Sequence, residues 1–195
     1  GLDVQIELVA AMGATKALRD GTVDAMIAGS VHDVLTEFPG WSGAKLSVAL
    51  SQGTPWLLTV RADLAARRGD VDALRGLRLT AAEGPDLVFK QMLRSAGLDP
   101  ERDLEIVELP GVQDRHVSFG VFAAQALQEG KIDGFWANAM GSEVAVRSGA
   151  GTVVLDVRRG IGPPASQYFT FAALVAADHL IANDPKGVAA SVRAI

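Results

Sequence analysis

The sequence predicts an α/β fold with mostly parallel sheets flanked by helices. Short apolar runs of strand length alternate along the chain with amphipathic segments of about ten residues, which is the pattern of βαβ units. The 195 residues are 49% hydrophobic and 21% charged, an ordinary globular composition. One nine-residue pattern occurs twice, which suits a division into two lobes.

The first elements follow from periodicity and from helix-ending residues. Val4, Ile6 and Leu8 alternate with polar residues, as in a half-buried strand. A helix is expected over 14–20, because Gly21 readily takes the positive φ of a helix C-terminus. The next expected elements are a strand at 24–28, a helix at 31–38 and strands at 46–50 and 56–60.

The later part of the chain continues this alternation. A strand at 77–80 leads to a helix at 85–96, which has Pro85 in its first turn and Gly97 after its end. The other expected elements are strands at 104–109, 132–136, 152–157 and 168–176, and helices at 119–129, 140–148 and from 184 onward. Two segments interrupt the pattern and are candidate crossovers between lobes: 61–76 and 158–167.

The repeated pattern reads ALRDGTVDA at 17–25 and ALQEGKIDG at 126–134. Each copy has the form of a helix end, a glycine, and then Val-Asp or Ile-Asp at the opening of a buried strand. Two interpretations stay open. Either one copy belongs to each lobe, or any helix-to-strand joint of such a fold has this form.

Composition excludes several classes of function. The chain has no cysteine, which excludes thiolate catalysis, iron–sulfur clusters, cysteine-based zinc sites and disulfides. The net charge of -5 and the lack of a basic block argue against a nucleic-acid partner. No apolar run reaches the roughly 18 residues that span a bilayer. No motif for a nucleotide, a metal or a serine nucleophile occurs, so we expect no cofactor, no metal and no catalytic residue.

Small polar loops follow the expected strands, where ligands of open α/β sheets bind. Backbone N–H groups at the helix starts there could hold a carboxylate, sulfonate or phosphate group. The candidate ligand-binding residues in these loops are Gly13, Ala14, Thr15, Gly29, Ser30, His32, Gln52, Thr54, Glu83, Asp86, Trp136 and Asn138.

Structural alternatives exist for several of these candidates. Thr15, Ser30 and Asp86 are also typical helix caps. Trp136 could pack in the core, because it ends a buried strand. Glu83 in a cleft would repel an anion and favour an amine or a hydroxyl-rich solute.

Several segments resemble the periplasmic substrate-binding proteins of ABC importers. The nearest branch is the sulfonate, nitrate and taurine type, which is related to binders of thiamine-pyrimidine precursors. The segments are GLDV at 1–4, ALRDGTVD at 17–24, LRGL at 74–77, GLDP at 97–100 and GKID at 130–133.

This resemblance implies a two-lobed periplasmic binding protein fold of type II. Lobe one would comprise 1–62 plus 170–195, lobe two 63–169, and the chain would be truncated at both ends. The family's cleft loops fall on the candidate residues above. Many relatives have Glu-Pro after the strand at 132–136, whereas this chain has ANAM at 137–140, so the identity of the ligand is not carried over.

The function that the resemblance implies is capture of a small solute in an interlobe cleft and delivery to a membrane ABC permease. Hinge closure of the lobes, a monomeric state, and a periplasmic location with the export leader absent from this chain are further expectations. The alternative is an enzyme on the same fold, of the pyrimidine-precursor or menaquinone-pathway type. A third option is a sensor domain that reads the same solute.

Overall fold

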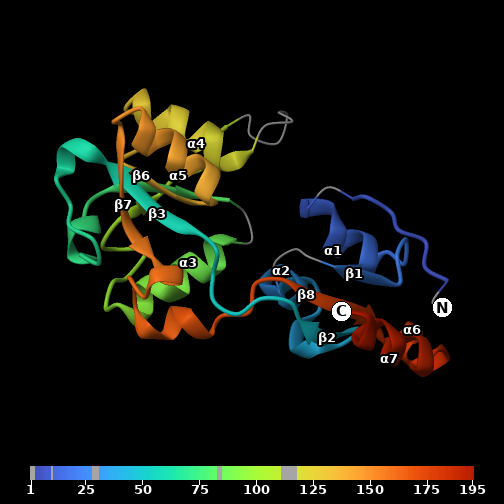
Figure 1. The fold of residues 1–195 in the computed structure, drawn as a ribbon. Coiled ribbons are helices and arrows are strands. Elements are labelled where there is room, and N and C mark those ends of the chain that lie inside the picture. The colour runs from blue at the N-terminus through green and yellow to red at the C-terminus, as the bar shows by residue number, and fades with distance from the viewer. Residues whose placement is uncertain (1–2, 10, 28–30, 83–84, 111–117) are drawn as a thin grey trace. The chain divides into compact units, whose positions relative to one another are not determined.

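The computed structural model describes residues 3–9, 11–27, 31–82, 85–110 and 118–195 of the chain. The chain forms two compact units (Figure 1). Unit 1 comprises Gly1–Gln52 and Thr170–Ile195, and unit 2 comprises Gly53–Phe169. Among the helices of the described part, none has both the length and the apolar character needed to cross a bilayer.

Unit 1 is built on a three-stranded sheet with the order β1-β8-β2. The central strand β8 runs antiparallel to both of its neighbours. Helices α1 and α2 pack against each other. The elements of this unit are α1 (Ala11–Arg19), β1 (Ala25–Ile27), α2 (Val31–Glu37), the 3-10 turn η1 (Pro39–Trp41), β2 (Ala44–Ala49), β8 (Ala173–Ala177), α6 (Asp178–Asn183) and α7 (Pro185–Ala194).

Unit 2 is built on a five-stranded sheet with the order β5-β4-β6-β3-β7. Strand β4 is parallel to β5 and β6, whereas β3 is antiparallel to β6 and β7. The elements are β3 (Leu57–Arg61), η2 (Ala62–Leu64), η3 (Asp72–Leu74), β4 (Arg78–Ala81), α3 (Pro85–Ser95), β5 (Glu105–Ile106), α4 (Phe119–Gln128), β6 (Gly134–Ala137), α5 (Ala139–Arg147), β7 (Gly151–Asp156), η4 (Val157–Arg159) and η5 (Pro164–Tyr168).

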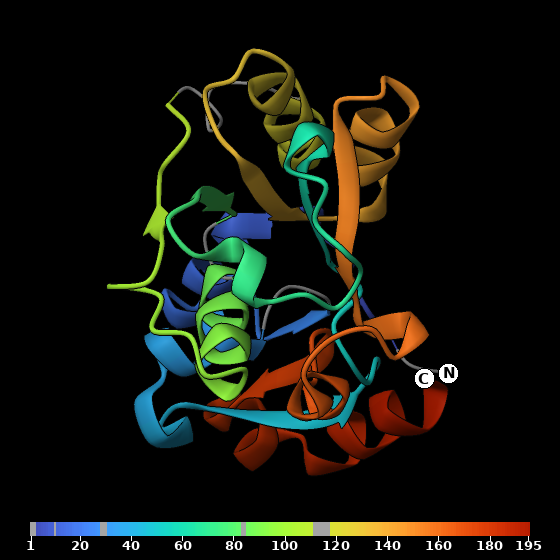
Figure 2. The same cartoon turned by 90° about the vertical axis from the view of Figure 1, so that its left-hand side faces the viewer.

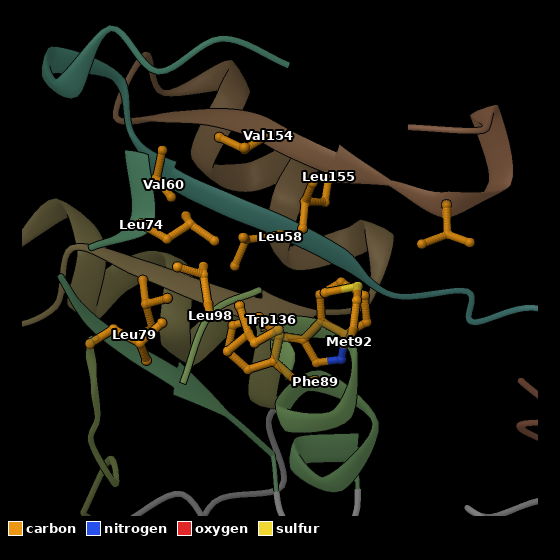
Figure 3. Packing of buried hydrophobic residues seen from close by; sticks show 13 residues of the cluster. Leu58, Val60, Leu74, Leu79, Phe89, Met92, Leu98, Trp136, Val154 and Leu155 are labelled. Atoms are coloured by element: carbon orange, nitrogen blue, oxygen red, sulfur yellow. The ribbon is translucent and has the colours of Figure 1, made fainter. Parts of the chain in front are cut away.

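Helices cover both faces of the sheet of unit 2. Figures 1 and 2 show α4 and α5 on one face and α3 on the other. On the α3 face, Trp136 of β6 stacks on Phe89 of α3, with ring centroids 5.5 Å apart (Figure 3). On the α4 and α5 face, small side chains such as Ala123 and Ala145 pack against Phe135. The unit therefore has one core on each side of its sheet.

The repeated sequence pattern forms the same joint in each unit. Gly21 and Gly130 take φ values of +73° and +70°. In both copies the residue after the glycine donates its N–H to the alanine carbonyl at the start of the pattern, at 2.9 and 3.0 Å. This is the hydrogen-bond pattern of a glycine-terminated helix. The carbonyl of the joint aspartate, Asp24 or Asp133, then accepts from the antiparallel strand at 2.9 Å in both units.

Strand β2 of unit 1 and strand β7 of unit 2 have the same irregularity in their pairing with the neighbouring antiparallel strand. In β2 the register shifts between Leu46 and Val48, which leaves Ser47 as a bulge residue. In β7 the register skips Val154 in the same way. Ser47 and Val154 are each the fourth residue of their strand. The structure therefore assigns one copy of the pattern to each unit, as parts of one repeated architecture.

The two joints differ in their aspartate side chains. Asp133 accepts four hydrogen bonds: from Arg61 Nη1 at 3.0 Å, and from the N–H, Nε and Nη2 of Arg78 at 2.9, 3.1 and 3.2 Å. Because Arg61 lies on β3 and Arg78 on β4, this carboxylate links three strands. Asp24 contacts only His179 Nε2, at 2.9 Å, among the contacts of its side chain in the described part, and it is 67% exposed.

The structure corrects three predictions. Residues 4–8 form no strand, and Val4, Ile6 and Leu8 are exposed, because no described strand pairs with them. The sheets are also not mostly parallel: the sheet of unit 2 is mixed, and both strand pairs of the unit 1 sheet are antiparallel. In each unit the antiparallel strand, β8 or β3, is the first strand after the chain enters that unit, so its direction reflects the route of the chain.

The third correction concerns the domain boundary. Residues 53–62, predicted in lobe one, belong to unit 2, because β3 lies between β6 and β7 in its sheet. Both predicted crossovers, 61–76 and 158–167, lie within unit 2. The chain passes between the units at 52–53 and at 169–170.

Candidate functional site

The carboxyl ends of four strands of unit 2 lie at one edge of its sheet. Strands β4, β5, β6 and β7 share one direction, and β3 runs the opposite way. Leu57, the first residue of β3, pairs with Ala137 and Asp156 at the ends of β6 and β7. Residues that precede β3 therefore lie at the same edge as residues that follow β4 and β6. Of the predicted residues, this places Thr54, Asp86 and Asn138 at one edge of unit 2.

Asn138 connects β6 to α5 and has both ends of its side-chain amide in use. It is the N-cap of α5, in extended backbone conformation, and its Oδ1 accepts from the N–H of Gly141 at 3.2 Å. This contact satisfies one of the N–H groups that a helix leaves free at its start. The Nδ2 of Asn138 donates to the hydroxyl of Ser118 at 3.1 Å.

Ser118 is the N-cap residue of α4, but its hydroxyl forms no capping hydrogen bond. The contact with Asn138 thus joins the starts of α4 and α5. The two helices approach closely here. A Cβ added to Gly141 would lie 2.4 Å from the backbone of Gly120, so only glycine fits. Close packing and the hydrogen bond together hold two helix N-termini side by side.

The donors left over at this point favour an anion. Asn138 and Ser118 are half-buried. With the amide oxygen committed to Gly141, Asn138 has one further N–H, and Ser118 has its own O–H. The N-termini of α4 and α5 add partial positive charge. The arrangement therefore presents donors and positive potential, which suits an acceptor group such as a sulfonate, phosphonate, carboxylate or nitrate oxygen.

Asp86 has a structural role at the same edge. It lies in the first turn of α3, where a carboxylate is favoured by the helix dipole, and it forms an ion pair with Lys90 at 2.8 Å. Lys90 neutralises its charge, so Asp86 does not make this edge negative. Thr54 is buried, and its hydroxyl accepts from the N–H of Trp56 at 3.3 Å. Gln52 is exposed and lies at the end of unit 1.

Trp136 is a core residue in this structure. Its side chain is fully buried among the α3-side residues of unit 2 and stacks on Phe89 (Figure 3). Along β6, alternate residues face opposite sides of the sheet, and Trp136 faces α3. Trp136 therefore packs in the core, as the alternative interpretation predicted. Its ring is not exposed and cannot contact a solute.

The predicted residues of unit 1 lie in helices. Gly13, Ala14 and Thr15 fall inside α1 and not in a loop before it, and Thr15 is buried. His32 is the second residue of α2 and is half-buried. Burial lowers the pKa of His32 below its usual value of 6.5, because the charged imidazolium is less stable away from water. Burial at this position therefore favours the neutral imidazole of His32.

Three predicted residues, Gly29, Ser30 and Glu83, lie outside the described residues. Within the described part, no group of three or more His, Asp or Glu side chains is placed to hold a metal ion.

Ser118 was missed by the sequence analysis. The candidate residues were those in loops that follow an expected strand, and no strand was expected immediately before Ser118. A usable signal was present, because Ser118 stands directly before the apolar start of the helix expected at 119–129, which is the position of an N-cap.

No protein-family model matches this chain, and no curated protein matches it by sequence. Solved structures do match. One is a sulfonate-binding periplasmic protein of a putative sulfonate ABC transporter from Methylobacillus flagellatus KT, with 20% identity and a TM-score of 0.65 over 91% of this chain and 49% of that one. Another is the alkanesulfonate-binding protein from Xanthomonas axonopodis pv. citri bound to MOPS, with 17% identity and a TM-score of 0.66 over 95% and 58%.

A third similar structure is the periplasmic nitrate-binding protein from Synechocystis PCC 6803, with 11% identity and a TM-score of 0.63 over 95% of this chain and 49% of that one. The chain thus spans about half the length of these proteins. All three are binding proteins. The resemblance seen in the sequence is confirmed for the fold: this chain has the α/β fold of the periplasmic solute-binding proteins of ABC importers.

Proposed function

We propose that the chain is part of the solute-binding component of an ABC import system, and that its solute carries an oxyanion group. The observation that carries the proposal is the pair Asn138–Ser118 at the carboxyl edge of unit 2. Between two helix N-termini it presents an amide N–H and a hydroxyl that donate to no other group within the described residues. The likeness to sulfonate- and nitrate-binding proteins supports the same class of solute.

In the proposed mechanism, the protein captures its solute in the periplasm and then delivers it to a permease in the membrane. Two crossings of the chain, at 52–53 and 169–170, provide a double connection of the kind that permits hinge closure. Gly53, at one crossing, has φ of +76°, a conformation that a side chain would strain. In this mechanism no covalent chemistry occurs, the protein acts as a monomer, and nucleic acid plays no part. We prefer this function to an enzyme on the same fold because the similar structures are binding proteins.

The remaining predicted residues keep their proposed role as neighbours of the solute. These are Gly13, Ala14, Thr15, Gly29, Ser30, His32, Gln52, Thr54, Glu83 and Asp86. Their contribution would be to set the shape and polarity around the rest of the solute, while Asn138 and Ser118 hold the anion.

Thermal unfolding of the full-length protein tests the proposal. A solute that binds the folded state raises the melting temperature by mass action. We expect a rise with at least one of MOPS, taurine, nitrate and methylphosphonate, and none with a neutral pyrimidine. If no compound of this oxyanion set changes the melting temperature, or if only the neutral pyrimidine does, the proposal is wrong.

Two variants test the site itself. Ser118→Ala removes one donor and should weaken binding about ten- to a hundredfold, since a hydrogen bond to a charged group contributes about 1.5–3 kcal/mol. Asn138→Asp keeps a good N-cap but places a negative charge at the anion, and should weaken binding by about a hundredfold or more. Asn183→Asp makes the same change of charge at an exposed position of unit 1 and serves as the control. Equal affinities in all three variants would place the solute elsewhere.

A further inference from the structure

A cluster of four exposed arginines lies beside the edge strand β7 of unit 2, and none of the four is among the residues of the proposed solute site. Arg67 and Arg68 come from the loop between η2 and η3, and Arg158 and Arg159 come from η4, which directly follows β7. We call these four residues the arginine patch. It is positively charged although the chain as a whole carries -5.

The backbone holds the two halves of the patch next to each other. The N–H of Gly69 donates to the carbonyl of Val154, the bulge residue of β7, at 2.8 Å. A Cβ on Gly69 would lie 3.8 Å from Cγ2 of Ile161, two residues after Arg159. The 67–69 loop and the segment after β7 are therefore neighbours.

The loop that carries Arg67 and Arg68 is a fixed turn. The N–H of Asp70 donates to the carbonyl of Arg67 at 3.2 Å, and Gly69 has φ of +81°. These are the features of a type II turn with glycine at its third position. Arg68 is the second residue of the turn and stands at its tip.

Arg158 and Arg159 are held by a buried carboxylate. Asp156 is buried and accepts from Nε and Nη2 of Arg158 at 3.0 and 3.2 Å, and Nε of Arg159 lies 3.5 Å from it. Asp156 also exchanges two backbone hydrogen bonds with Ile161, at 2.9 and 3.0 Å. The guanidinium groups remain 46% and 69% exposed at the side-chain level, so they are both oriented and accessible.

The charge balance of the patch is positive. Two acids are counted with the patch: Asp156, which pairs with Arg158 and Arg159, and Asp70, which closes the turn and accepts from the N–H of Ala73 at 3.2 Å. Four arginines against two aspartates leave a net charge of +2. Within the described part of the chain, neither Arg67 nor Arg68 forms an ion pair.

We infer that the arginine patch is a docking surface for a partner protein that presents aspartate and glutamate side chains. Two observations favour a protein over a lipid surface. Orienting Arg158 and Arg159 in advance lowers the entropy lost on binding, which benefits a specific interface most. Tyr168 is 74% exposed and follows Gln167, whose side chain lies beside Gly160. Tyrosine and arginine are both enriched at the residues that contribute most to binding in protein interfaces. Carboxylates are also natural partners of the guanidinium fork.

The experiment uses a fluorescein-labelled octaglutamate peptide as the probe and measures fluorescence anisotropy with the full chain at low ionic strength. We expect saturable binding that weakens as salt is raised. The double variant Arg67→Glu with Arg68→Glu should bind at least tenfold more weakly, and the corresponding double Gln variant should fall between it and the wild type.

The matched control is Arg102→Glu with Arg147→Glu, two exposed arginines outside the patch. Both doubles change the net charge from -5 to -9. They differ in position and in the surface ion pairs that Arg102 and Arg147 form with Asp99, Asp103 and Glu143. Equal loss in the two doubles, or no binding by the wild type, overturns the inference. If the chain floats with phosphatidylglycerol vesicles, loses this property when Arg67 and Arg68 are replaced, and does not bind the peptide, then the patch binds a membrane surface and the inferred protein partner is wrong. None of these outcomes affects the melting-temperature test of solute binding, which is measured separately.

Discussion

Replacing Asp133 by Asn tests whether one carboxylate stabilises unit 2 by linking three strands. The carboxylate accepts four hydrogen bonds, from Arg61 and Arg78, and its side chain is only 13% exposed. A hydrogen bond to a charged group contributes about 1.5–3 kcal/mol. The guanidinium groups are 32% and 41% exposed and regain water when the charge is lost. We therefore expect Asp133→Asn to lower the free energy of unfolding by about 2–3 kcal/mol, well below the sum over four bonds.

The assay is urea unfolding followed by tryptophan fluorescence in a Trp41→Phe background. Trp41 lies in unit 1, so the remaining tryptophans, Trp56 and Trp136, report unit 2. The matched control is Asp24→Asn, the same change at the equivalent joint of unit 1. Because Asp24 is 67% exposed and its partner His179 is 54% exposed, we expect the control to cost no more than about 0.5 kcal/mol. This control is measured in the chain that keeps Trp41, because that tryptophan reports unit 1.

A loss below about 0.5 kcal/mol for Asp133→Asn would refute this reasoning, because the three-strand link would then contribute no more than a surface ion pair. A loss equal to that of Asp24→Asn would show the same. An unchanged dependence on urea concentration is required in both variants, since a changed slope would mean that the unfolded state differs.

Three further outcomes are expected. Burial disfavours the charged form of Asp133, but the hydrogen bonds and charges of Arg78 and Arg61 outweigh burial and lower its pKa below 3.8. The contribution of Asp133 to stability is therefore full above pH 3.8 and is lost as the pH falls below that value. In this acidic range, the free energy of unfolding of the wild type should depend more steeply on pH than that of Asp133→Asn. Gly141→Ala should destabilise unit 2 by about 1–3 kcal/mol or more in urea, since its Cβ would meet the backbone of Gly120 at 2.4 Å. Thr59→Val should cost about 1–3 kcal/mol because it leaves the buried hydroxyl of Ser142 without its 2.9 Å partner, whereas adding Ser142→Ala should recover most of that loss.

The sequence predicted the helices and most strands because periodicity and helix-ending glycines are local signals. Gly21 and Gly130 end their helices as expected, and the repeated pattern around them forms equivalent joints. Residues 4–8 show where the local signal fails. A period-two pattern is necessary for a half-buried strand, but a strand also needs a partner, and none is present among the described residues.

Strand direction and domain boundary depend on information that is not local. β3 and β8 read as ordinary apolar strands, but they run antiparallel because each begins where the chain enters a unit. The amino-acid sequence of β3 does not specify its position in the sheet between β6 and β7. The boundary was therefore placed at the next charged segment, about ten residues late.

The candidate site was predictable in part for the same reasons. The rule of residues after strands reached Asn138, which the structure places at a helix start with its amide oriented. The same expectation included Trp136, which lies one residue before the end of β6. Side chains along a strand alternate between the two faces of the sheet, and Trp136 is on the face that is buried in the core. Ser118 meets Asn138 only in the folded chain, because the packing of Gly120 against Gly141 brings the two helix starts together.

We propose that Asn138 and Ser118 hold an oxyanion, and nitrogen-resolved NMR of the full-length protein can detect this contact at the two residues themselves. The measurement compares spectra with and without a saturating sulfonate such as MOPS. We expect the largest shifts at the side-chain amide of Asn138 and at the backbone N–H groups of Ser118, Phe119 and Ala139. Saturable sulfonate binding that leaves these signals unmoved would show that the oxyanion binds elsewhere and not at Asn138 and Ser118.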